Sequence, residues 1–300
     1  MQTDTTRTKS IILAIVGYTI FGFSLFFSRN ALSYTTPVVL LAVRFIVAFL
    51  ILNVMLLFKP FELKLKGKGK ALIPLVLIGL MQPVAYFLCE TYSVNFMPTS
   101  VVAIITSLCP IASIVFGAIL LKERVTAKKL IFVVISVVGV ILTTLGEEIS
   151  GVVTMLGIIL SLVAVAAATA FNLLSRYVKE EFSAFEKTYV MFLLGSVVFT
   201  AIALITSRGQ YKELIITPLS SGMFWLDMLY LAGFSSVGAF FAINYSYSKL
   251  KIQEVVVFNS LSTVFSVIAG VLFLAEPFGV YQIVGSLLVV LGVIFAGLTK

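Results

Sequence analysis

Long apolar segments recur along the whole of this 300-residue chain, separated by short polar stretches. A helix needs about 20 predominantly apolar residues to cross the hydrocarbon core of a bilayer. Apolar residues make up 60% of the chain and charged residues 11%, whereas soluble domains have roughly 45–50% and about 25%. A soluble protein of this length has too little interior to bury so much apolar surface. The chain is therefore predicted to be an all-α integral membrane protein.

The apolar segments predict ten transmembrane helices. Their approximate ranges are 10–29, 37–58, 71–92, 99–121, 127–146, 152–175, 186–207, 224–248, 252–275 and 279–298. Pro98 and Pro277 mark breaks where the connecting loops are short and lack basic residues. The first segment follows Arg7 and Lys9, as in a signal peptide, but no small-residue cleavage site comes after it. We therefore expect it to remain as an uncleaved first span.

Basic residues are distributed unevenly over the loops that ten spans produce. One set of loops, together with both chain ends, holds 17 lysines and arginines, whereas the other holds Arg29, Arg208 and Lys212. Membrane proteins gather Lys and Arg on the cytoplasmic side. Both termini are therefore expected in the cytoplasm, in a multi-pass protein of the cytoplasmic membrane that contacts lipid. The net charge of +8 then requires no nucleic-acid partner.

Several combinations of reactive side chains are missing from the sequence. The lack of histidine excludes Ser-His-Asp and Cys-His nucleophiles and an HExxH zinc site. Asp4 and Asp227 are the only aspartates, and Asp4 lies in the polar tail, so an intramembrane aspartyl dyad is not expected. Cys89 and Cys109 have neither disulfide nor metal-ligand spacing. We expect no enzyme activity, no metal site and no cofactor, and the lack of a GxxxxGK[ST] loop argues against a built-in ATP motor.

The chain contains an internal repeat. When the sequence is shifted by 153 residues, 84–144 aligns with 237–297 without a gap, and about 15 of 61 positions are identical. The matches include polar and glycine positions: Tyr92-Ser93 with Tyr245-Ser246, Glu123 with Glu276, and Gly139 with Gly292. The predicted repeats, 10–146 and 152–298, contain five spans each. Because five is odd, the second copy enters the membrane from the opposite side, an arrangement typical of secondary transporters.

These features resemble the drug/metabolite transporter superfamily, in particular EamA-type transporters with two EamA domains. The resemblance rests on Tyr92-Ser93, Pro110, Glu123-Arg124 and Gly139-Val140, and in the second copy on Tyr245-Ser246, Glu276-Pro277, Gly285 and Gly292-Val293. The chain departs from the family pattern where Phe21-Gly22 replaces Trp-Gly, Phe132 replaces a glycine, and Thr263 aligns with Pro110. The resemblance implies a carrier of small metabolites, often an exporter.

Small polar residues form matching stripes on the fourth and ninth spans. Thr106, Cys109 and Ser113 have the i, i+3, i+7 spacing of one helix face, and their repeat partners are Asn259, Ser262 and Ser266. Such stripes either line a substrate cavity between inverted halves or let the helices pack closely and hydrogen-bond. Further candidates for substrate binding are Tyr18, Tyr86, Tyr245, Asn172 and Asn244. Spans one, three, four, six, eight and nine are predicted to form the cavity wall.

Arg44 and Glu90 are the charged residues that lie most clearly inside predicted spans, and both fall in the outer half. An intramembrane ionisable residue is a functional candidate by default. The two could form a charge pair, and Glu90 could couple transport to protons or bind an amine. The alternatives are interfacial solvation for Glu90, and snorkelling or a structural pair for Arg44.

Two prolines and two glutamates add structural expectations. Pro83 and Pro110 each remove a backbone hydrogen bond, and the freed carbonyls either bind a ligand or are satisfied again around an ordinary kink. Glu123 and Glu276 follow the fourth and ninth spans, and their recurrence suggests a shared structural role, such as holding the next helix start.

The sequence thus predicts a secondary transporter that moves a small metabolite across the cytoplasmic membrane by alternating access, as an exporter. The metabolite is expected to be an amino acid, an amine or a drug-like solute. A membrane channel and a non-transporting scaffold or receptor subunit are the alternatives. As the family leads us to expect, the glycine-bearing fifth and tenth spans are candidate faces for a homodimer.

Overall fold

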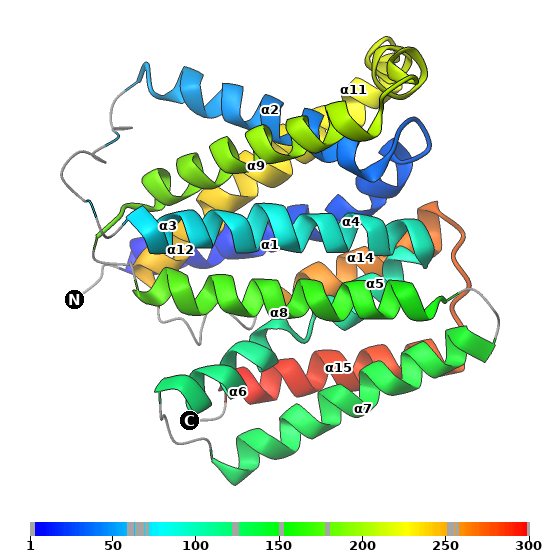
Figure 1. Ribbon diagram of the computed structural model, residues 1–300. Coiled ribbons are helices and arrows are strands. Elements are labelled where there is room, and N and C mark those ends of the chain that lie inside the picture. Colours follow the sequence, from blue (N-terminus) through cyan, green and yellow to red (C-terminus); the bar gives the residue numbers. More distant parts are fainter. Residues whose placement is uncertain are drawn as a thin grey trace.

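The computed structural model describes residues 4–58, 63, 69, 72–121, 126–149, 153–177, 181–250, 255 and 258–298, and this part of the chain contains helices and no strand (Figure 1). In chain order the elements are α1 (Asp4–Ala31), α2 (Pro37–Met55), α3 (Leu72–Gly79), η2 (Leu80–Tyr86), α4 (Phe87–Phe96), α5 (Thr99–Thr106), α6 (Cys109–Leu121), α7 (Ala127–Ile149), α8 (Met155–Tyr177), α9 (Ala184–Thr206), η3 (Lys212–Ile216), α10 (Thr217–Leu219), α11 (Gly222–Met228), η4 (Leu229–Ala239), α12 (Phe240–Lys249), α14 (Asn259–Phe273) and α15 (Val280–Leu298). The elements η2, η3 and η4 are π-helical.

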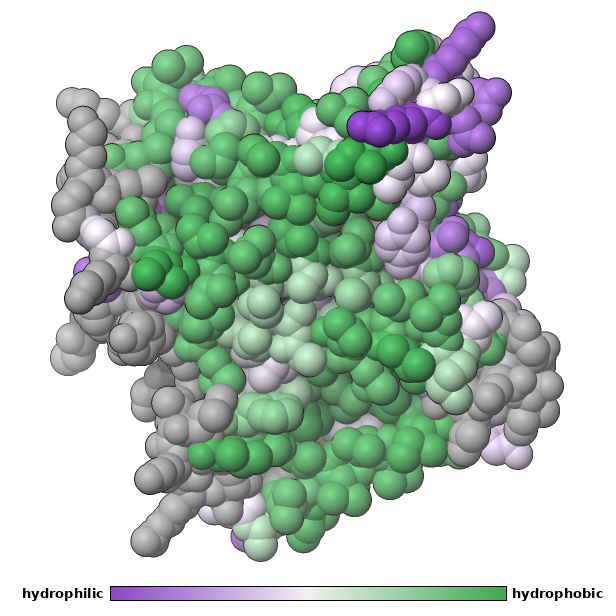
Figure 2. Space-filling view, viewed as in Figure 1, coloured by the Kyte–Doolittle hydropathy of each residue, from purple (hydrophilic) through white to green (hydrophobic). Residues whose placement is uncertain are grey.

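Within the described residues, six helices are long and apolar enough to cross a membrane: Thr6–Ala31, Pro37–Met55, Leu72–Phe96, Met155–Ser175, Phe185–Thr206 and Gly222–Ile243. Shorter apolar helices cover Thr99–Ser113, Leu130–Thr143, Asn259–Phe273 and Val280–Ala296. Figure 2 shows hydrophobic side chains across the middle of the bundle and several hydrophilic residues gathered at its upper right end. The predicted all-α membrane class is confirmed, while the count of ten spans and their orientation stay predictions.

Helix contacts follow a pattern that is preserved when the two halves are exchanged. Helix α1 packs against α14, η4 and α12, and α8 packs in the same way against α5, η2 and α4. Helix α2 pairs with α9, and α7 pairs with α15. Helix α1 begins and α15 ends at the left of Figure 1, so both ends of the described chain lie at the same end of the bundle.

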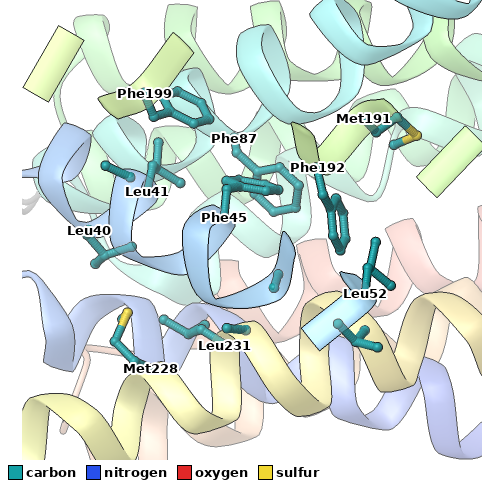
Figure 3. Close-up of a cluster of buried hydrophobic side chains, with 14 of the residues drawn as sticks. Leu40, Leu41, Phe45, Leu52, Phe87, Met191, Phe192, Phe199, Met228 and Leu231 are labelled. Carbon is teal, nitrogen blue, oxygen red and sulfur yellow. The ribbon is translucent and has the colours of Figure 1, made fainter. Parts of the chain in front are cut away.

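Aromatic rings pack α2 against its neighbours. Phe45 lies edge-on to Phe87 and Phe192, with ring centroids 5.3 and 5.4 Å apart, and stacks on Phe199 at 5.6 Å (Figure 3). A Cβ atom at Gly195 would lie 3.1 Å from the Phe45 ring, so the glycine lets α9 approach closely. Each such ring pair contributes about 0.5–1.5 kcal/mol beyond its buried area. This packing fixes the part of the α2 backbone that carries Arg44.

Pro110 interrupts the fourth predicted span. Helix α5 ends at Thr106, a two-residue turn follows, and α6 begins at Cys109. Of the predicted stripe, Thr106 is thus the last residue of α5, and Cys109 and Ser113 lie on α6. The proline has no N–H to bond to the carbonyl four residues earlier, and its ring clashes with that carbonyl. The aligned Thr263 lies inside the unbroken α14, so the break belongs to the first copy alone.

Pro83 changes the helix type without ending the helix. It lies inside η2, and the helical chain runs on from Leu72 to Phe96. A π-helical turn bonds i to i+5 and occurs frequently at functional sites. The 153-residue shift places 80–86 on 233–239, which falls within η4. Both copies therefore carry a π-helical stretch at the same position, although the second copy has Ser236 in place of the proline.

Glu276 connects the end of α14 to the start of α5. Its Oε1 accepts hydrogen bonds from the Thr99 amide at 2.6 Å and the Thr99 hydroxyl at 2.8 Å, and its Oε2 accepts one from the Ser100 amide at 2.9 Å. A carboxylate at a helix N-terminus satisfies free amides and complements the helix dipole. The expected role at a helix start is confirmed, but the helix is α5 of the other half and not the next one. Glu123 lies outside the described residues.

Helices α7 and α15 pack through small residues. A Cβ atom at Gly139 would lie 2.6 Å from the carbonyl oxygen of Gly285, and one at Gly292 would lie 2.8 Å from the carbonyl oxygen of Phe132. The fifth and tenth predicted spans, which were expected to offer dimer faces, thus use these glycines to pack against each other within the chain. The exposed apolar side chains of the pair include Ile131, Val134, Val138, Ile283, Leu287 and Leu291. These outer faces, and not the glycines, would have to form any homodimer through these helices.

Candidate functional site

Arg44 on α2 is almost completely buried, with 1% of its surface exposed. Its Nε donates a hydrogen bond to the Ser236 hydroxyl at 2.9 Å, and its Nη2 donates one to the Ser235 hydroxyl at 3.3 Å. Both serines lie on η4 and are fully buried. A first-half guanidinium therefore binds a second-half helix, and it does not snorkel to the membrane surface.

Two aromatic rings lie close to the guanidinium. The Cζ atom of Arg44 lies 4.5 Å from the ring centroid of Phe87 and 5.9 Å from that of Phe45. Figure 3 shows these two rings beside each other in the core. A desolvated cation over an aromatic face gains about 2 kcal/mol. Packing and cation–π contacts thus hold the guanidinium in one orientation.

Glu90 on α4 is buried close to this cation. The Tyr86 hydroxyl donates a hydrogen bond to Glu90 Oε1 at 2.6 Å, and 9% of the glutamate is exposed. The charges of Glu90 and Arg44 are close enough to interact, but within the described part of the chain the two residues form no direct ion pair. The Cys109 thiol at the start of α6 is also close enough to Glu90 to interact with its charge. We call Arg44, Tyr86, Glu90, Ser235 and Ser236 the Arg44 cluster.

The fourth-span stripe divides between two settings. The Thr106 hydroxyl donates to the carbonyl of Val102 at 2.8 Å, so its own helix satisfies it. The Ser113 hydroxyl donates to the carbonyl of Cys109 at 2.8 Å and accepts a bond from Asn172 Nδ2 at 3.0 Å. The structure therefore brings Asn172 on α8 to Ser113 and places Cys109 beside the Arg44 cluster.

The two serines of the ninth-span stripe donate hydrogen bonds to backbone carbonyls. Ser262 donates to the carbonyl of Asn259 at 2.7 Å, and the buried Ser266 donates to the carbonyl of Gly22 on α1 at 2.6 Å. A Cβ atom at Gly22 would lie 2.9 Å from the carbonyl oxygen of Ser262. Small polar residues used in this way favour the alternative of close helix packing over substrate binding.

The remaining predicted residues lie in separate settings. Tyr18 is buried, with its ring 6.4 Å from that of Phe21 in an edge-on arrangement. The half-buried Tyr245 ring lies 5.5 Å from Lys9 Nζ. Asn244 belongs to α12, and its side chain lies outside the described part of the structure.

Sequence reasoning missed the serines that bind Arg44 and left the second span out of the predicted cavity wall. Ser235 also donates to the Ser24 hydroxyl on α1 at 3.2 Å, so three spans meet around these hydroxyls. Two adjacent serines in an apolar span were a visible signal. The repeat comparison did not single them out, because they lie just before the aligned range that begins at residue 237.

One nitrogen of the Arg44 cluster has no partner. Arg44 Nη1 is buried and makes no hydrogen bond. The other buried side-chain atoms without a partner in the described residues are serine hydroxyls, of Ser100, Ser175, Ser207 and Ser260. Nη1 is therefore the one charged group among them. The described residues contain no cluster of three or more His, Cys, Asp or Glu that could hold a metal ion.

Comparison with known proteins identifies the family. The model of the EamA-like transporter family matches residues 8–145 and again residues 155–298. The chain belongs to the EamA-like transporter family. The resemblance predicted from the sequence is confirmed, and the protein is a multi-pass protein of the cell membrane. The family and the relatives below are named as transporters.

Relatives match over nearly the whole chain. The uncharacterized transporter YcxC of Bacillus subtilis (strain 168) is 31% identical over 292 residues, which cover 96% of this chain and 92% of that protein. An uncharacterized transporter of Archaeoglobus fulgidus is 23% identical, over 95% of this chain and 97% of its own length. A solved crystal structure superposes with a TM-score of 0.67 at 16% identity, covering 96% of this chain and 97% of that one. The last likeness shows the fold alone.

Proposed function

We propose that this EamA-family protein is a secondary transporter that moves a small metabolite across the cytoplasmic membrane by alternating access, as an exporter. The two family matches support a chain of two related halves, 10–146 and 152–298. In this proposal the chain has ten spans with both termini in the cytoplasm. Each half then has five spans, so the two halves are inverted relative to each other. Inverted halves can exchange roles and so supply the two equivalent arrangements that alternating access needs. The exchangeable contacts of α1 and α8 support this.

The Arg44 cluster is the observation that carries the proposal. A charge inside a membrane protein is expensive and marks a functional site by default. Here the cation comes from α2 in the first half, and the hydroxyls that bind it come from η4 in the second. A movement between the halves would therefore change the surroundings of the buried charge. A static scaffold has no need of such an arrangement.

The paired π-helical segments provide the moving elements. Tyr86 is the last residue of η2, and Ser235 and Ser236 lie in η4, so both segments contribute to the cluster. The wider turn of a π-helix is a departure from the α-helical minimum and frequently marks a functional site. We propose that η2 and η4 rearrange as the substrate site changes the side to which it opens.

Glu90 is proposed as the coupling group and Cys109, Thr106 and Tyr86 as further parts of the substrate site. The carboxyl of Glu90 is buried and bonded to Tyr86, so a proton or a bound cation would change its interaction with Arg44. The substrate gradient or ion exchange would drive transport. We propose secondary contacts with substrate for Ser113, Asn172, Asn259, Ser262, Ser266, Tyr18, Tyr245 and Asn244. A homodimer through the outer faces of α7 and α15 is also part of this proposal.

Counterflow in proteoliposomes tests the function. Vesicles that hold purified protein are loaded with pooled amino acids, amines, sugars or nucleosides, and uptake of labelled solute is followed with and without a pH gradient. Saturable exchange of one class is expected, and Glu90→Gln should abolish its dependence on the gradient. Uptake that neither saturates nor exchanges would indicate a channel. A folded protein that exchanges nothing would indicate a scaffold or receptor subunit, and Asn259→Leu with unaltered transport would remove the ninth-span stripe from the site.

A further inference from the structure

The guanidinium of Arg44 is buried away from water, and one of its nitrogens forms no hydrogen bond within the protein. Nε and Nη2 bond to Ser236 and Ser235, whereas Nη1 is buried without a partner. Removing a partner from a buried charged donor costs more than a neutral hydrogen bond is worth, because the desolvation is not repaid. A buried cation with an unpartnered donor nitrogen either destabilises the protein or serves to bind a ligand.

Two structural explanations of Arg44 are excluded by its surroundings. The side chain does not snorkel, because 1% of it is exposed. It forms no direct ion pair with the buried carboxyl of Glu90, which accepts a hydrogen bond from Tyr86. The buried Nη1, which has no partner in the protein, can be satisfied by a group that is brought in from outside. We propose that Arg44 binds the carboxylate of the transported metabolite, so that the substrate class is small monocarboxylates, an inference that rests on the proposed transport function.

The orientation of the guanidinium favours a carboxylate. Its planar fork matches the two oxygens of a carboxylate in a bidentate pair, through two parallel N–H donors. The open Nη1 lies beside Nη2, whose bond to Ser235 is long at 3.3 Å. A carboxylate across these two nitrogens would therefore replace only the weaker of the two serine bonds. The 2.9 Å bond from Nε to Ser236 and the Phe87 ring would keep the guanidinium in place.

The charge of the cluster favours a monoanion. Arg44 supplies one positive charge, and the neighbouring Glu90 carboxyl would repel a dianion such as hydrogen phosphate. A substrate with a single carboxylate brings half the negative charge of a dianion, and it balances Arg44 when Glu90 is protonated. An amine without a carboxylate would meet the guanidinium as a like charge. The site therefore selects for the carboxylate and against a substrate whose only charge is positive.

The site is closed in this conformation. Nη1 is sealed from solvent, so a substrate reaches it only when η2 or η4 moves away from Arg44. In this conformation the Ser235 hydroxyl of η4 accepts the Nη2 hydrogen bond that a substrate carboxylate would accept. Substrate binding and helix movement are thereby coupled through the hydrogen bond from Nη2 to Ser235.

Matched pairs of probes test the inference on the wild-type protein. Thermal unfolding in detergent and counterflow are measured with benzoate against benzamide and benzylamine, and with L-leucine against L-leucinamide. Sodium chloride and sodium phosphate are added as inorganic anions. We expect one or both carboxylates to stabilise the protein and to exchange, with their amides at least about 30-fold weaker, as for the loss of a buried charge partner. Exchange of amides or amines that is as strong as that of the carboxylates overturns the inference, as does stabilisation by phosphate or chloride alone.

Variants then assign the effect to Arg44. Arg44→Gln should weaken carboxylate binding by at least about 30-fold, and Arg44→Lys should restore part of it because the charge returns without the fork. Arg208→Gln is the matched control, since it removes an exposed arginine beyond α9. Carboxylate selectivity that is unchanged in a folded Arg44→Gln protein overturns the assignment. If Arg44→Gln does not fold, Arg44→Lys and the wild-type pairs decide.

Failure of the inference and failure of the proposed function give different results. Exchange of solutes that lack a carboxylate leaves the protein a transporter and removes only the substrate class. The absence of exchange and of stabilisation by every solute in a folded protein removes both.

Discussion

The contact between α7 and α15 and the Arg44 cluster both place polar groups inside the molecule, but they treat them differently. In the α7–α15 contact, Ser136 donates to the carbonyls of Phe132 at 3.1 Å and Val289 at 3.4 Å, and Thr143 donates to that of Gly139 at 3.0 Å. These hydroxyls are satisfied by backbone. In the Arg44 cluster, a buried charged nitrogen is left without a partner.

The difference teaches how to separate packing from binding in a membrane protein. Small polar residues let helices approach, and their hydroxyls bond to backbone that is always present. A substrate site must keep a donor or acceptor open for a group that comes and goes. The state of satisfaction, and not the polarity of the residue, therefore distinguishes the two regions.

The largest effect is expected when the α7–α15 contact is overpacked. A Cβ atom at Gly285 would lie 2.6 Å from the Gly139 carbonyl oxygen and 3.0 Å from the Thr143 amide. Gly285→Leu should therefore destabilise the protein by about 3 kcal/mol, measured as the midpoint of thermal unfolding in detergent. Gly222→Leu is the control, because a Cβ atom there meets nothing within 4 Å. Equal midpoints for the two variants would contradict the packing role of the glycine.

The next effect should be on transport and not on folding. Tyr86→Phe removes the donor to Glu90, and a hydrogen bond to a charged group contributes about 1.5–3 kcal/mol. Exchange should fall about 10–100-fold, since each 1.4 kcal/mol is about tenfold, with an unfolding midpoint close to that of the control. Tyr189→Phe serves as that control, because it removes a hydroxyl that donates to Asn53 Oδ1 at 3.0 Å, outside the Arg44 cluster. Exchange that is equally rapid in both variants would show that the Tyr86–Glu90 bond is structural.

A smaller change is expected at the start of α5. Glu276→Gln keeps the shape of the side chain but turns an amide group toward one of the backbone donors that Glu276 now accepts from. Loss of a helix cap costs about 1 kcal/mol. The unfolding midpoint should fall accordingly, whereas the exposed Glu213→Gln in η3 should leave it unchanged. A fall of the same size in both would mean that overall charge, and not the cap, sets the stability.

The smallest effect is expected from a single satisfied hydroxyl. Ser136→Ala removes bonds to Phe132 and Val289, and interhelical hydrogen bonds in membrane proteins contribute about 0.6 kcal/mol on average. The midpoint should fall slightly more than in Ser286→Ala, whose exposed hydroxyl donates to the carbonyl of Ile283. A loss as large as that of Gly285→Leu would place hydrogen bonding above close packing in the α7–α15 contact and would end the distinction drawn here.

Part of the candidate site could be predicted from the sequence. Arg44 and Glu90 were identified because a charge in an apolar segment is visible without any knowledge of the fold. Their partners were not: Ser236 lies 192 residues beyond Arg44, and nothing in the repeat pattern pairs them. The stripe of Asn259, Ser262 and Ser266 had the spacing expected of a cavity face, but spacing does not say whether a hydroxyl meets a substrate or a neighbouring backbone carbonyl.

The sequence by itself determined the membrane class, the approximate helix ranges, the internal repeat and the family, because hydropathy and spacing are properties of neighbouring residues. Only the tertiary structure decided which half of the molecule satisfies Arg44, that the glycines of α7 and α15 face each other, and that Pro83 gives a π-helical turn while Pro110 ends a helix. These outcomes depend on contacts between segments far apart in the chain. Such contacts leave no periodic pattern in the sequence. They decide whether a polar side chain packs against backbone or stays open to bind a substrate.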